Sequence, residues 1–430
     1  MRRALFWLLT TTVLLGGQLV AAGPAAADPG LLDPGFGSGG KTTTSFAGDA
    51  GASAAVLQDG KVVAAGFAVT GATTDFALTR YRPDGTLDPS FGDHGRVTTD
   101  ITGGAGDSAT ALAVQADGKL VVAGLTSGPA GQDFALVRYR PNGTVDPSFG
   151  NHGRVTTDFA GGADAAHALV IQADGKLVAA GSATFGTNQD FAIARYNPNG
   201  TPDVSFGTGG RATIDIAGAF DEARALVLQG GKLVAAGFTF TGDAATGDFA
   251  LARFTAAGHP DGTFGTGGTV TTDFAGGFDD ARALVIQGGK LVAAGSGTTA
   301  SGPDFALARY DEHGSLDPTF GSGGKVTTDF APVFGDADEI NALVLQQGKL
   351  VAAGSSFTGG GLRFDFAVAR YRQNGDLDAT FGTGGTTTTD FARREDRAQA
   401  LVVQGGRPVA VGSAVSGSGK QSFALARYLS

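Results

Sequence analysis

The chain has 430 residues, of which 72 are glycine and none is cysteine, and its formal net charge is −10. So high a glycine content excludes a helical protein, because each interior glycine costs about 1 kcal/mol relative to alanine in a helix. A hydrophobic fraction of 42% excludes a disordered glycine-rich linker, and the lack of a three-residue glycine period excludes collagen. Composition therefore favours many short strands joined by glycine turns.

The first 27 residues are typical of a secretory signal peptide. Arg2 and Arg3 form the charged start, Ala4–Val20 is apolar, and three alanines at 25–27 offer a small-residue cleavage site. The apolar stretch has 17 residues, the lower limit for a membrane span, so we favour cleavage over retention as an anchor. Cleavage leaves a single domain, residues 28–430, and an exported chain without cysteine fits a bacterial exoprotein.

The charge of the exported chain limits its partners. Loss of the two arginines changes the formal net charge from −10 to −12, and an acidic surface repels nucleic acid and anionic lipid. We therefore expect a secreted, extracellular monomer. Its partner is expected to be a protein, a carbohydrate or an anionic ligand, with no contact to nucleic acid or, after cleavage, to a membrane.

Three phrases recur along the chain and define its repeat. A phrase such as Gly118–Gly124 (GKLVVAG) and a phrase such as Asp133–Tyr139 (DFALVRY) each occur seven times. The dipeptide Phe-Gly also occurs seven times, at Phe36, Phe91, Phe149, Phe206, Phe264, Phe320 and Phe381. Seven copies of a unit of about 57 residues therefore fill the exported chain.

Each copy contains four runs typical of strands. Examples in chain order within a copy are Ala168–Gln172, Lys176–Ala180 and Asp190–Tyr196, with Arg154–Phe159 representing the fourth run. Asn-Gly and Asp-Gly turns between the runs favour hairpins. Four antiparallel strands repeated seven times predict an all-β, seven-bladed β-propeller, whose sheets bury both faces against their neighbours. Burial on both faces explains why the runs are continuously apolar.

The two ends of the repeat array complement each other. The exported chain begins with a fourth-strand sequence, residues 39–46, and stops after a third strand that ends at Tyr428. We predict that the N-terminal strand completes the seventh blade. This pairing would close the ring and leave no open sheet edge.

The phrases resemble those of the delta-60 repeat family. The resemblance spans residues 31–428 and is carried by phrases such as Leu87–Gly92 (LDPSFG), Gln172–Gly181 (QADGKLVAAG) and Asp304–Tyr310 (DFALARY). It implies an exported bacterial protein with a propeller fold, and it implies no activity or catalytic residues. The chain departs from the pattern at Phe254 (elsewhere tyrosine), Ser422 (elsewhere aspartate) and Pro408.

One arginine occurs in the third strand of every copy, on a face that also carries apolar side chains. A guanidinium buried there needs an acceptor, and an aspartate follows eight residues later in six copies, while Asp33 can serve the last arginine. We predict structural Arg–Asp pairs that fix the connection between third and fourth strands. The arginines are Arg80, Arg138, Arg195, Arg253, Arg309, Arg370 and Arg427, and the other aspartates are Asp88, Asp146, Asp203, Asp261, Asp317 and Asp378.

Loop lengths distinguish the two faces of the predicted disc. The connections from first to second and from third to fourth strands are nearly uniform, which is typical of a scaffold; we call this side the uniform face. The opposite side, the variable-loop face, carries the loops between second and third strands and between blades, including long loops within 237–248 and 354–365 and around 331–334. Variable loops on a rigid scaffold commonly carry binding.

One polar position at the start of each first strand differs in type from copy to copy. If the first strands line a central channel, these side chains ring its mouth and could hold a carboxylate, a phosphate or a sugar. The plainer alternative is a solvated strand start that tolerates any polar residue. The seven mouth residues are Ser53, Thr110, His167, Arg224, Arg282, Asn341 and Gln399.

Aspartates near the mouth form a second ring. Calcium needs six or more oxygen ligands, and Asp279–Asp280 or the group Asp336, Asp338 and Glu339 could supply some of them. Capping of the turns, in which the aspartates accept hydrogen bonds from backbone N–H groups, explains the same residues without a metal. We therefore expect no cofactor, with calcium as the alternative. The ring consists of Asp107, Asp164, Asp221, Asp279, Asp338 and Asp396.

Motifs for catalysis find little support. The sequence has no cysteine- or histidine-rich metal pattern, which argues against zinc and haem, and no nucleophile elbow or Walker-type loop. Of five histidines, only His167 approaches the predicted mouth. We therefore expect a binding or interaction module. The alternatives are a polysaccharide-acting hydrolase or lyase with carboxylates near the mouth and a purely structural exoprotein.

Overall fold

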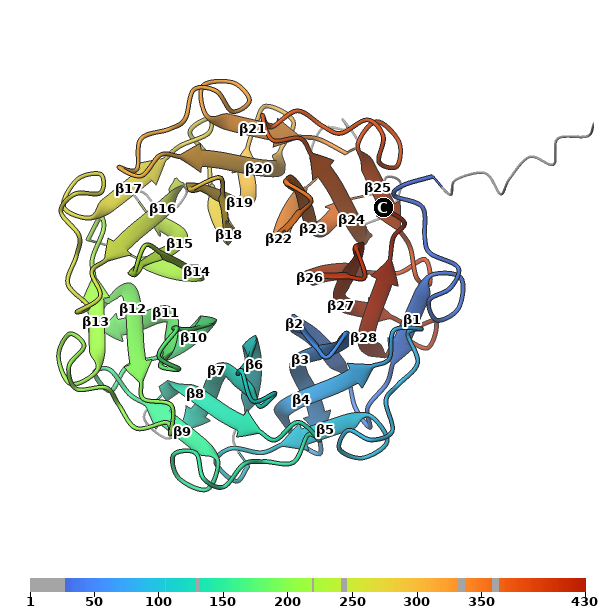
Figure 1. Ribbon diagram of the computed structural model, residues 1–430, viewed down its shortest axis with the longest axis horizontal. Coiled ribbons are helices and arrows are strands. Elements are labelled where there is room, and N and C mark those ends of the chain that lie inside the picture. Colours follow the sequence, from blue (N-terminus) through green and yellow to red (C-terminus); the bar gives the residue numbers. More distant parts are fainter. Residues whose placement is uncertain are drawn as a thin grey trace, which may run out of the picture.

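The computed structural model describes residues 28–430 except 105, 129–130, 219, 241–245, 331–336 and 358–362. Within these residues, 28 strands form seven four-stranded antiparallel sheets around a common axis (Figure 1). The predicted seven-bladed, all-β propeller is thus confirmed. The signal peptide expected at 1–27 and the inter-blade loop around 331–334 lie outside the described residues.

Every blade has its first strand nearest the axis and its fourth strand outermost (Figure 1). Blades 1 to 3 are β2 (Ala50–Gln58), β3 (Lys61–Thr70), β4 (Thr73–Tyr81), β5 (Arg96–Thr99); β6 (Asp107–Val114), β7 (Leu120–Gly128), β8 (Gly131–Tyr139), β9 (Arg154–Thr157); and β10 (Asp164–Ile171), β11 (Leu177–Phe185), β12 (Asn188–Tyr196), β13 (Arg211–Ile214). Blades 4 and 5 are β14 (Asp221–Gln229), β15 (Lys232–Phe240), β16 (Gly247–Phe254), β17 (Thr269–Thr272); and β18 (Asp280–Gln287), β19 (Lys290–Thr298), β20 (Pro303–Tyr310), β21 (Lys325–Thr328). Blades 6 and 7 are β22 (Asp338–Gln346), β23 (Lys349–Phe357), β24 (Phe364–Tyr371), β25 (Thr386–Thr389); and β26 (Asp396–Gln404), β27 (Arg407–Val415), β28 (Gln421–Arg427) with β1 (Lys41–Thr44).

The apolar core is divided among the interfaces between neighbouring blades. At the interface of blades 3 and 4, Phe206 packs with Val178 and Ile193 of its own blade and with Leu233 and Phe254 of the next, all essentially inaccessible to solvent. Equivalent clusters occur at the other six interfaces. Both faces of each sheet are therefore buried, as the continuously apolar strands predict.

The N-terminal strand closes the ring. β1 pairs antiparallel with β28, from Lys41 opposite Ala426 to Thr44 opposite Phe423. Outside the strands, the N–H of Gly382 in blade 6 donates to the carbonyl of Pro29 at 2.8 Å. The predicted closure is confirmed.

A buried tyrosine joins neighbouring blades in six places. In one of them the hydroxyl groups of Tyr196 and of Thr157 in the preceding blade lie 2.8 Å apart. In blade 4 the equivalent positions hold Phe254 and Ile214, which pack in the same apolar cluster. Because both hydroxyl groups are replaced together, neither is left buried without a partner.

We expect Phe254→Tyr to lower the free energy of unfolding by about 1–3 kcal/mol, because its hydroxyl would be buried against Ile214. Adding Ile214→Thr should supply the missing partner and recover most of that loss, whereas Ile214→Thr alone should destabilise. Denaturant unfolding of the two single variants and the double variant measures the coupling. Additive effects of the two substitutions would contradict this account.

Candidate functional site

The seven mouth residues share one structural position, the extra residue of a β-bulge in the first strand. In β10, for example, pairing with β11 shifts between Ala166 and Ala168 and leaves His167 without a partner in the ladder. The same shift brackets each of the other six. All seven side chains are half-buried. A bulge changes the direction of a side chain and is common near functional sites.

The bulge explains why the second-strand phrase, such as GKLVAAG, ends in glycine in every copy. In blade 4 this residue is Gly237, which lies opposite Ala223. A Cβ added to Gly237 would lie 1.8 Å from the carbonyl oxygen of Glu222. Only glycine therefore admits the backbone of the bulged strand at this distance.

Five mouth residues contact the first strand of the next blade. Thr110 donates to the carbonyl of Ala166 at 2.5 Å, and Asn341 donates to the carbonyl of Ala398 at 2.9 Å. The other three are His167, Arg224 and Arg282. These five mouth residues thus form contacts between blades, and they are not simply solvated strand starts.

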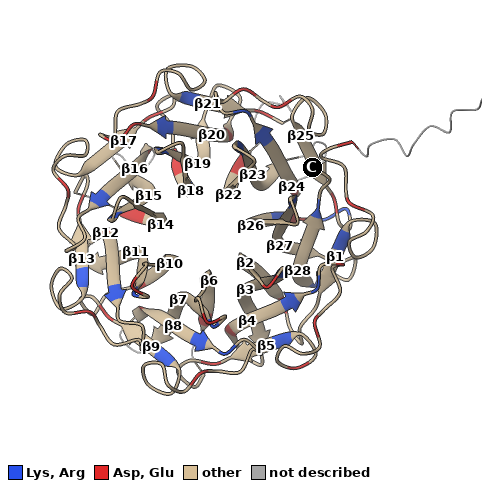
Figure 2. Cartoon of the chain, viewed as in Figure 1, with Lys and Arg blue, Asp and Glu red and all other residues tan. Residues whose placement is uncertain are grey.

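In blades 4 to 7 these contacts become a continuous ion network, which we call the charged arc. It consists of Glu222, Arg224, Asp280, Arg282, Glu339 and Arg397. Arg224 contacts Glu222 at 3.0 Å (Nε–Oε1) and Asp280 at 2.6 Å (Nη1–Oδ2). Figure 2 shows charged residues on the inner strands β14, β18, β22 and β26. The charge around the mouth is therefore concentrated on one side of the ring.

The arc continues with the same alternation of charge. Arg282 contacts Asp280 at 2.7 Å and Glu339 at 2.5 Å, and Arg397 contacts Glu339 at 3.0 Å. Burial alone would raise the pKa of Glu339, but the charges of Arg282 and Arg397 hold it below its ordinary value. Each guanidinium of the arc already has a carboxylate partner, so an anionic ligand would have to compete with those carboxylates.

His167 lies at one end of the arc. Its Nε2 is 3.4 Å from Oε1 of Glu222 in the next blade. Burial lowers the pKa of His167, against the opposing effect of Glu222. The imidazole is therefore neutral at pH 7.

Four phenylalanines beside the arc form a second feature, which we call the Phe cluster. It comprises Phe220, Phe238, Phe240 and Phe278, whose neighbouring ring centroids are 5.4–6.1 Å apart. Phe220 and Phe278 remain 37% and 36% exposed. The guanidinium carbon of Arg224 is 5.0 Å from the centroid of the Phe238 ring, so the cluster and the arc are continuous.

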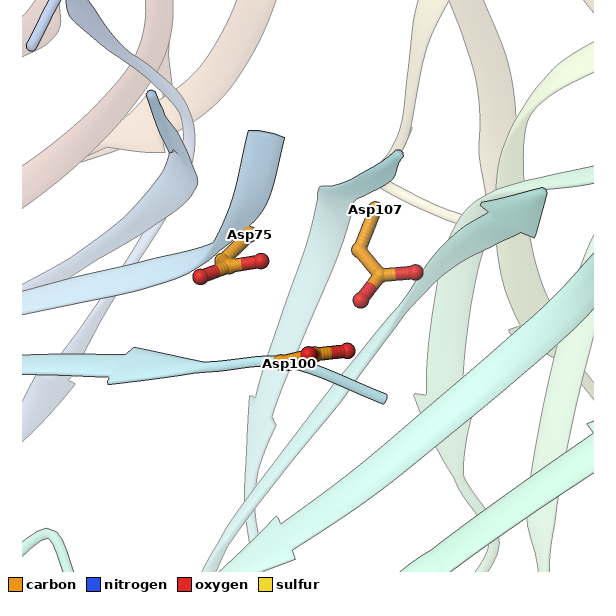
Figure 3. A group of neighbouring side chains, drawn as sticks. All are labelled: Asp75, Asp100 and Asp107. Atoms are coloured by element: carbon orange, nitrogen blue, oxygen red, sulfur yellow. The ribbon is translucent and has the colours of Figure 1, made fainter. Parts of the chain in front are cut away.

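The ring of first-strand aspartates has a different environment from the mouth. Asp107 accepts a hydrogen bond from the backbone N–H of Ile101 at 2.7 Å, as the capping interpretation predicts. Its carboxyl group also lies close to those of two aspartates of the preceding blade, Asp75 in β4 and Asp100 directly after β5 (Figure 3). Asp280 and Glu339, considered above as calcium ligands, instead pair with arginines of the arc. Asp336, the other residue of that group, lies outside the described residues.

The structure contains all seven Arg–Asp pairs, with Nε–Oδ2 distances of 2.7–3.0 Å. In blade 3, Arg195 contacts Asp203 at 2.7 Å, stacks over the Phe206 ring at 4.5 Å and donates to the carbonyl of Ala256 in the next blade at 2.6 Å. The pairs thus lie in the connections of the uniform face, and the arginines of six pairs also donate to a carbonyl of the next blade.

Sequence reasoning missed Glu222, Arg397 and the Phe cluster, and it considered Asp280 and Glu339 only as calcium ligands, not as partners of the mouth arginines. Glu222, Asp280 and Glu339 each lie two residues before a mouth residue. Each of these carboxylates contacts the mouth residue of the preceding blade. One signal in the sequence could have found these carboxylates: the position two residues before each mouth residue also varies from copy to copy.

The fold and its repeat define a β-propeller repeat protein. The family model "Domain of unknown function (DUF5122) beta-propeller" matches six segments: residues 57–91, 115–149, 172–206, 231–264, 289–320 and 348–381. These matches support a β-propeller repeat family, and the delta-60 name stays an expectation. A search of curated proteins returned no match.

Several solved structures are similar to this chain at low sequence identity. Sqt1 from Chaetomium thermophilum is 13% identical with a TM-score of 0.48, and the match covers 89% of this chain and 97% of Sqt1. The β-propeller domain of the Trilobed protease from Pyrococcus furiosus is 10% identical (TM-score 0.43; 89% and 94% covered). A protein of unknown function from Dyadobacter fermentans is 11% identical (TM-score 0.47; 92% and 100% covered). These similarities carry no argument about function. In the described part of the chain, no helix has the length and hydropathy needed to cross a membrane.

Proposed function

We propose that this propeller is an exported binding module whose ligand contacts the variable-loop face where the Phe cluster meets the charged arc. The observation that carries the proposal is the juxtaposition of exposed Phe220 and Phe278 with half-buried Arg224. Exposed aromatic rings beside a few fixed polar groups are typical of binding sites. The uniform face offers a contrast, because its arginines are engaged in contacts between blades.

A carbohydrate fits this chemistry best. The charged arc offers both donors and acceptors for hydroxyl groups, and the phenylalanine rings offer flat apolar faces for C–H groups. A simple anion fits less well, because Arg224 and Arg282 both contact Asp280, which is fully buried. Displacing that carboxylate would leave a buried charge without a partner.

We expect Phe220→Ala combined with Phe278→Ala to weaken carbohydrate binding at least tenfold, because aromatic anchors dominate the energy of such sites. Both rings are partly exposed, so the variant should keep its fold. Screening the purified protein against a panel of glycans identifies the probe, and titration calorimetry measures the affinity.

Val204→Ala is the matched control for this experiment. Val204 is 78% exposed and lies in a connection of the uniform face, so its loss removes an exposed apolar side chain without touching the proposed site. Equal affinities of the wild type and the double phenylalanine variant would show that the ligand binds elsewhere. Failure of every glycan in the panel would reject a carbohydrate ligand.

One observation favours a second candidate, an enzyme that acts on polysaccharides. Neutral His167 could accept a proton from a substrate, and the Glu222 carboxylate, 3.4 Å away beside the same surface, would stabilise the imidazolium that forms. Release of new sugar ends in the glycan panel, lost in His167→Ala, would favour the enzyme. Binding without release would favour the module.

A further inference from the structure

Every lysine and arginine in the loops of the variable-loop face belongs to blades 6 and 7. The loops between second and third strands of the other five blades have none, and neither do the other six loops between blades. Three of these cationic side chains are exposed and one is half-buried. Because the chain as a whole is acidic, this part of the face attracts an anion more than the rest does. We call it the basic patch, and its residues are Arg363, Arg393, Arg394 and Lys420.

The cations of the basic patch have no carboxylate partner among the described residues. Nη2 of Arg394 donates to the carbonyl of Gly417 at 3.2 Å, and Lys420 donates to the carbonyls of Phe46 and Ala47 at 2.7 and 2.9 Å. In the charged arc, by contrast, each guanidinium contacts a carboxylate. An anionic group could therefore bind the basic patch without displacing a carboxylate of the protein.

The acidic residues at the junction of blades 6 and 7 are buried or already have partners. Asp396 is fully buried, and Glu395 contacts the last arginine of the arc at 2.8 Å. Oδ1 of Asp390 accepts a hydrogen bond from the backbone N–H of Arg393. None of these carboxylates forms an ion pair with the basic patch, so they leave its guanidinium groups open to a ligand.

Arg393 occupies a backbone position that is glycine at four other junctions. Its φ angle is 57°, and those of the equivalent glycines are 75–84°. In all five loops the N–H of this residue donates to the aspartate three positions earlier. Glycine adopts this left-handed conformation more readily than a residue with a Cβ, and exceptions are concentrated at functional sites. The four glycines are Gly103, Gly161, Gly218 and Gly276.

A second aromatic pair lies beside the basic patch. Phe357 and Phe364 face each other at the ends of β23 and β24, with ring centroids 5.7 Å apart, and both are half-buried. Arg363 directly precedes Phe364. The guanidinium carbon of Arg397 is 3.7 Å from the centroid of the Phe364 ring. The arc therefore has the Phe cluster beside Arg224 and this second pair, with the basic patch, beside Arg397.

We propose that the ligand is an acidic polysaccharide whose carboxylate or sulfate groups bind the basic patch. This inference rests on the proposed function and extends that site along the arc to blades 6 and 7. Guanidinium groups bind such oxygens through charge-assisted, paired hydrogen bonds, and the second aromatic pair offers another flat apolar surface to a sugar ring. A neutral glycan would leave the guanidinium groups of the patch without a partner.

Two matched pairs of polysaccharides test the charge of the ligand. Polygalacturonate is compared with its neutral methyl ester, and dextran sulfate with neutral dextran. We expect at least one acidic probe to bind about tenfold more tightly than its neutral counterpart at low salt, as a few exposed ion pairs allow. Added salt should reduce this preference, because it screens exposed charges. The acidic probe that is preferred identifies carboxylate or sulfate as the group bound, and equal binding within both pairs would overturn the proposal.

Arg393→Gly combined with Arg394→Gly tests the basic patch itself. The variant copies the glycine pairs at 161–162 and 276–277 of other junctions, so its loop should keep its fold. Binding of the preferred acidic probe should weaken about tenfold, and binding of its neutral counterpart should not change. Arg82→Gln combined with Arg140→Gln is the matched control, because it removes the same charge from exposed turns of the uniform face. The control should bind both probes like the wild type.

The double phenylalanine variant distinguishes this inference from the proposed function. Phe220→Ala with Phe278→Ala should weaken acidic and neutral probes alike. If it does so while the double glycine variant binds the acidic probe like the wild type, the basic patch is overturned and the proposed site stands. If only the double glycine variant weakens binding of the acidic probe, the proposed site at the Phe cluster is wrong and the basic patch stands.

Discussion

Removal of residues 28–48 is expected to abolish cooperative folding of the whole ring. The segment supplies β1 to the seventh blade, Phe36 to a buried apolar cluster and Asp33 to Arg427, whose Nε lies 2.7 Å from Oδ2 of the aspartate. Loss of a buried aromatic side chain costs about 3–5 kcal/mol, and breaking a buried ion pair costs about as much. Together these losses approach the entire stability of a typical domain, about 5–15 kcal/mol.

Circular dichroism during heating and size-exclusion chromatography measure this effect. The truncated chain should melt without a sharp transition and should aggregate, because β28 becomes an open sheet edge. Thr44→Val is a milder comparison, since it keeps β1 and removes only the 2.8 Å hydrogen bond from the Tyr81 hydroxyl. A melting curve unchanged by the truncation would show that ring closure does not stabilise the fold.

Arg195→Met is expected to lower the free energy of unfolding by about 3–5 kcal/mol, because it leaves the buried carboxylate of Asp203 without its charged partner. Lys176 also contacts this carboxylate, at 3.0 Å, and should limit the loss toward the lower figure. Arg140→Met is the control, since Arg140 is exposed in a turn and its loss should change stability by less than about 0.5 kcal/mol. Equal stability of Arg195→Met and the wild type would refute the structural role of the pairs.

The same pair predicts a dependence on pH. Burial alone would raise the pKa of Asp203, but hydrogen bonds from Ser205 and Lys176 and the charge of Arg195 hold it well below its ordinary value. A carboxylate whose pKa is depressed by folding contributes stability above its unfolded pKa and loses it as the pH falls toward the folded value. The stability difference between the wild type and Asp203→Asn should therefore be constant above about pH 5 and shrink below about pH 4. A difference that grows on acidification would contradict this sign.

The fold could be predicted from the sequence because the signals for turns and strands are local and recur in every copy. Each hairpin is marked by its own turn, as at Asp59 and Gly60, whose φ angles of 51° and 75° fit the predicted type I′ turn. Continuously apolar strands then require burial of both faces, which seven packed sheets provide. Six of the seven Arg–Asp pairs could be predicted equally well, because both members lie in one copy at a fixed spacing of eight residues, and the seventh, Arg427 with Asp33, followed from the predicted closure.

The candidate site could be predicted less completely from the sequence, because its residues come from different blades. The sequence indicated Arg224, Arg282 and Asp280 separately, but not that Asp280 lies between the two arginines, because a bulge, which spacing alone does not reveal, sets the direction of these side chains. The Phe cluster combines the C-terminal end of β15 with the segments that precede β14 and β18. Adjacent residues such as Asp279 and Asp280 point to different partners for the same reason.

The closure of blade 7 brings the two ends of the described chain together. The N–H of Gly30 donates to the carbonyl of Leu429 at 2.8 Å, and Leu32 forms a bridge with Tyr428. Blade order around the ring is therefore cyclic in space, although it is linear along the chain. A circular permutation that joins residue 430 to residue 28 and opens the exposed turn at Gly186 would retain every sheet of the ring and move the non-covalent junction from blade 7 to blade 3.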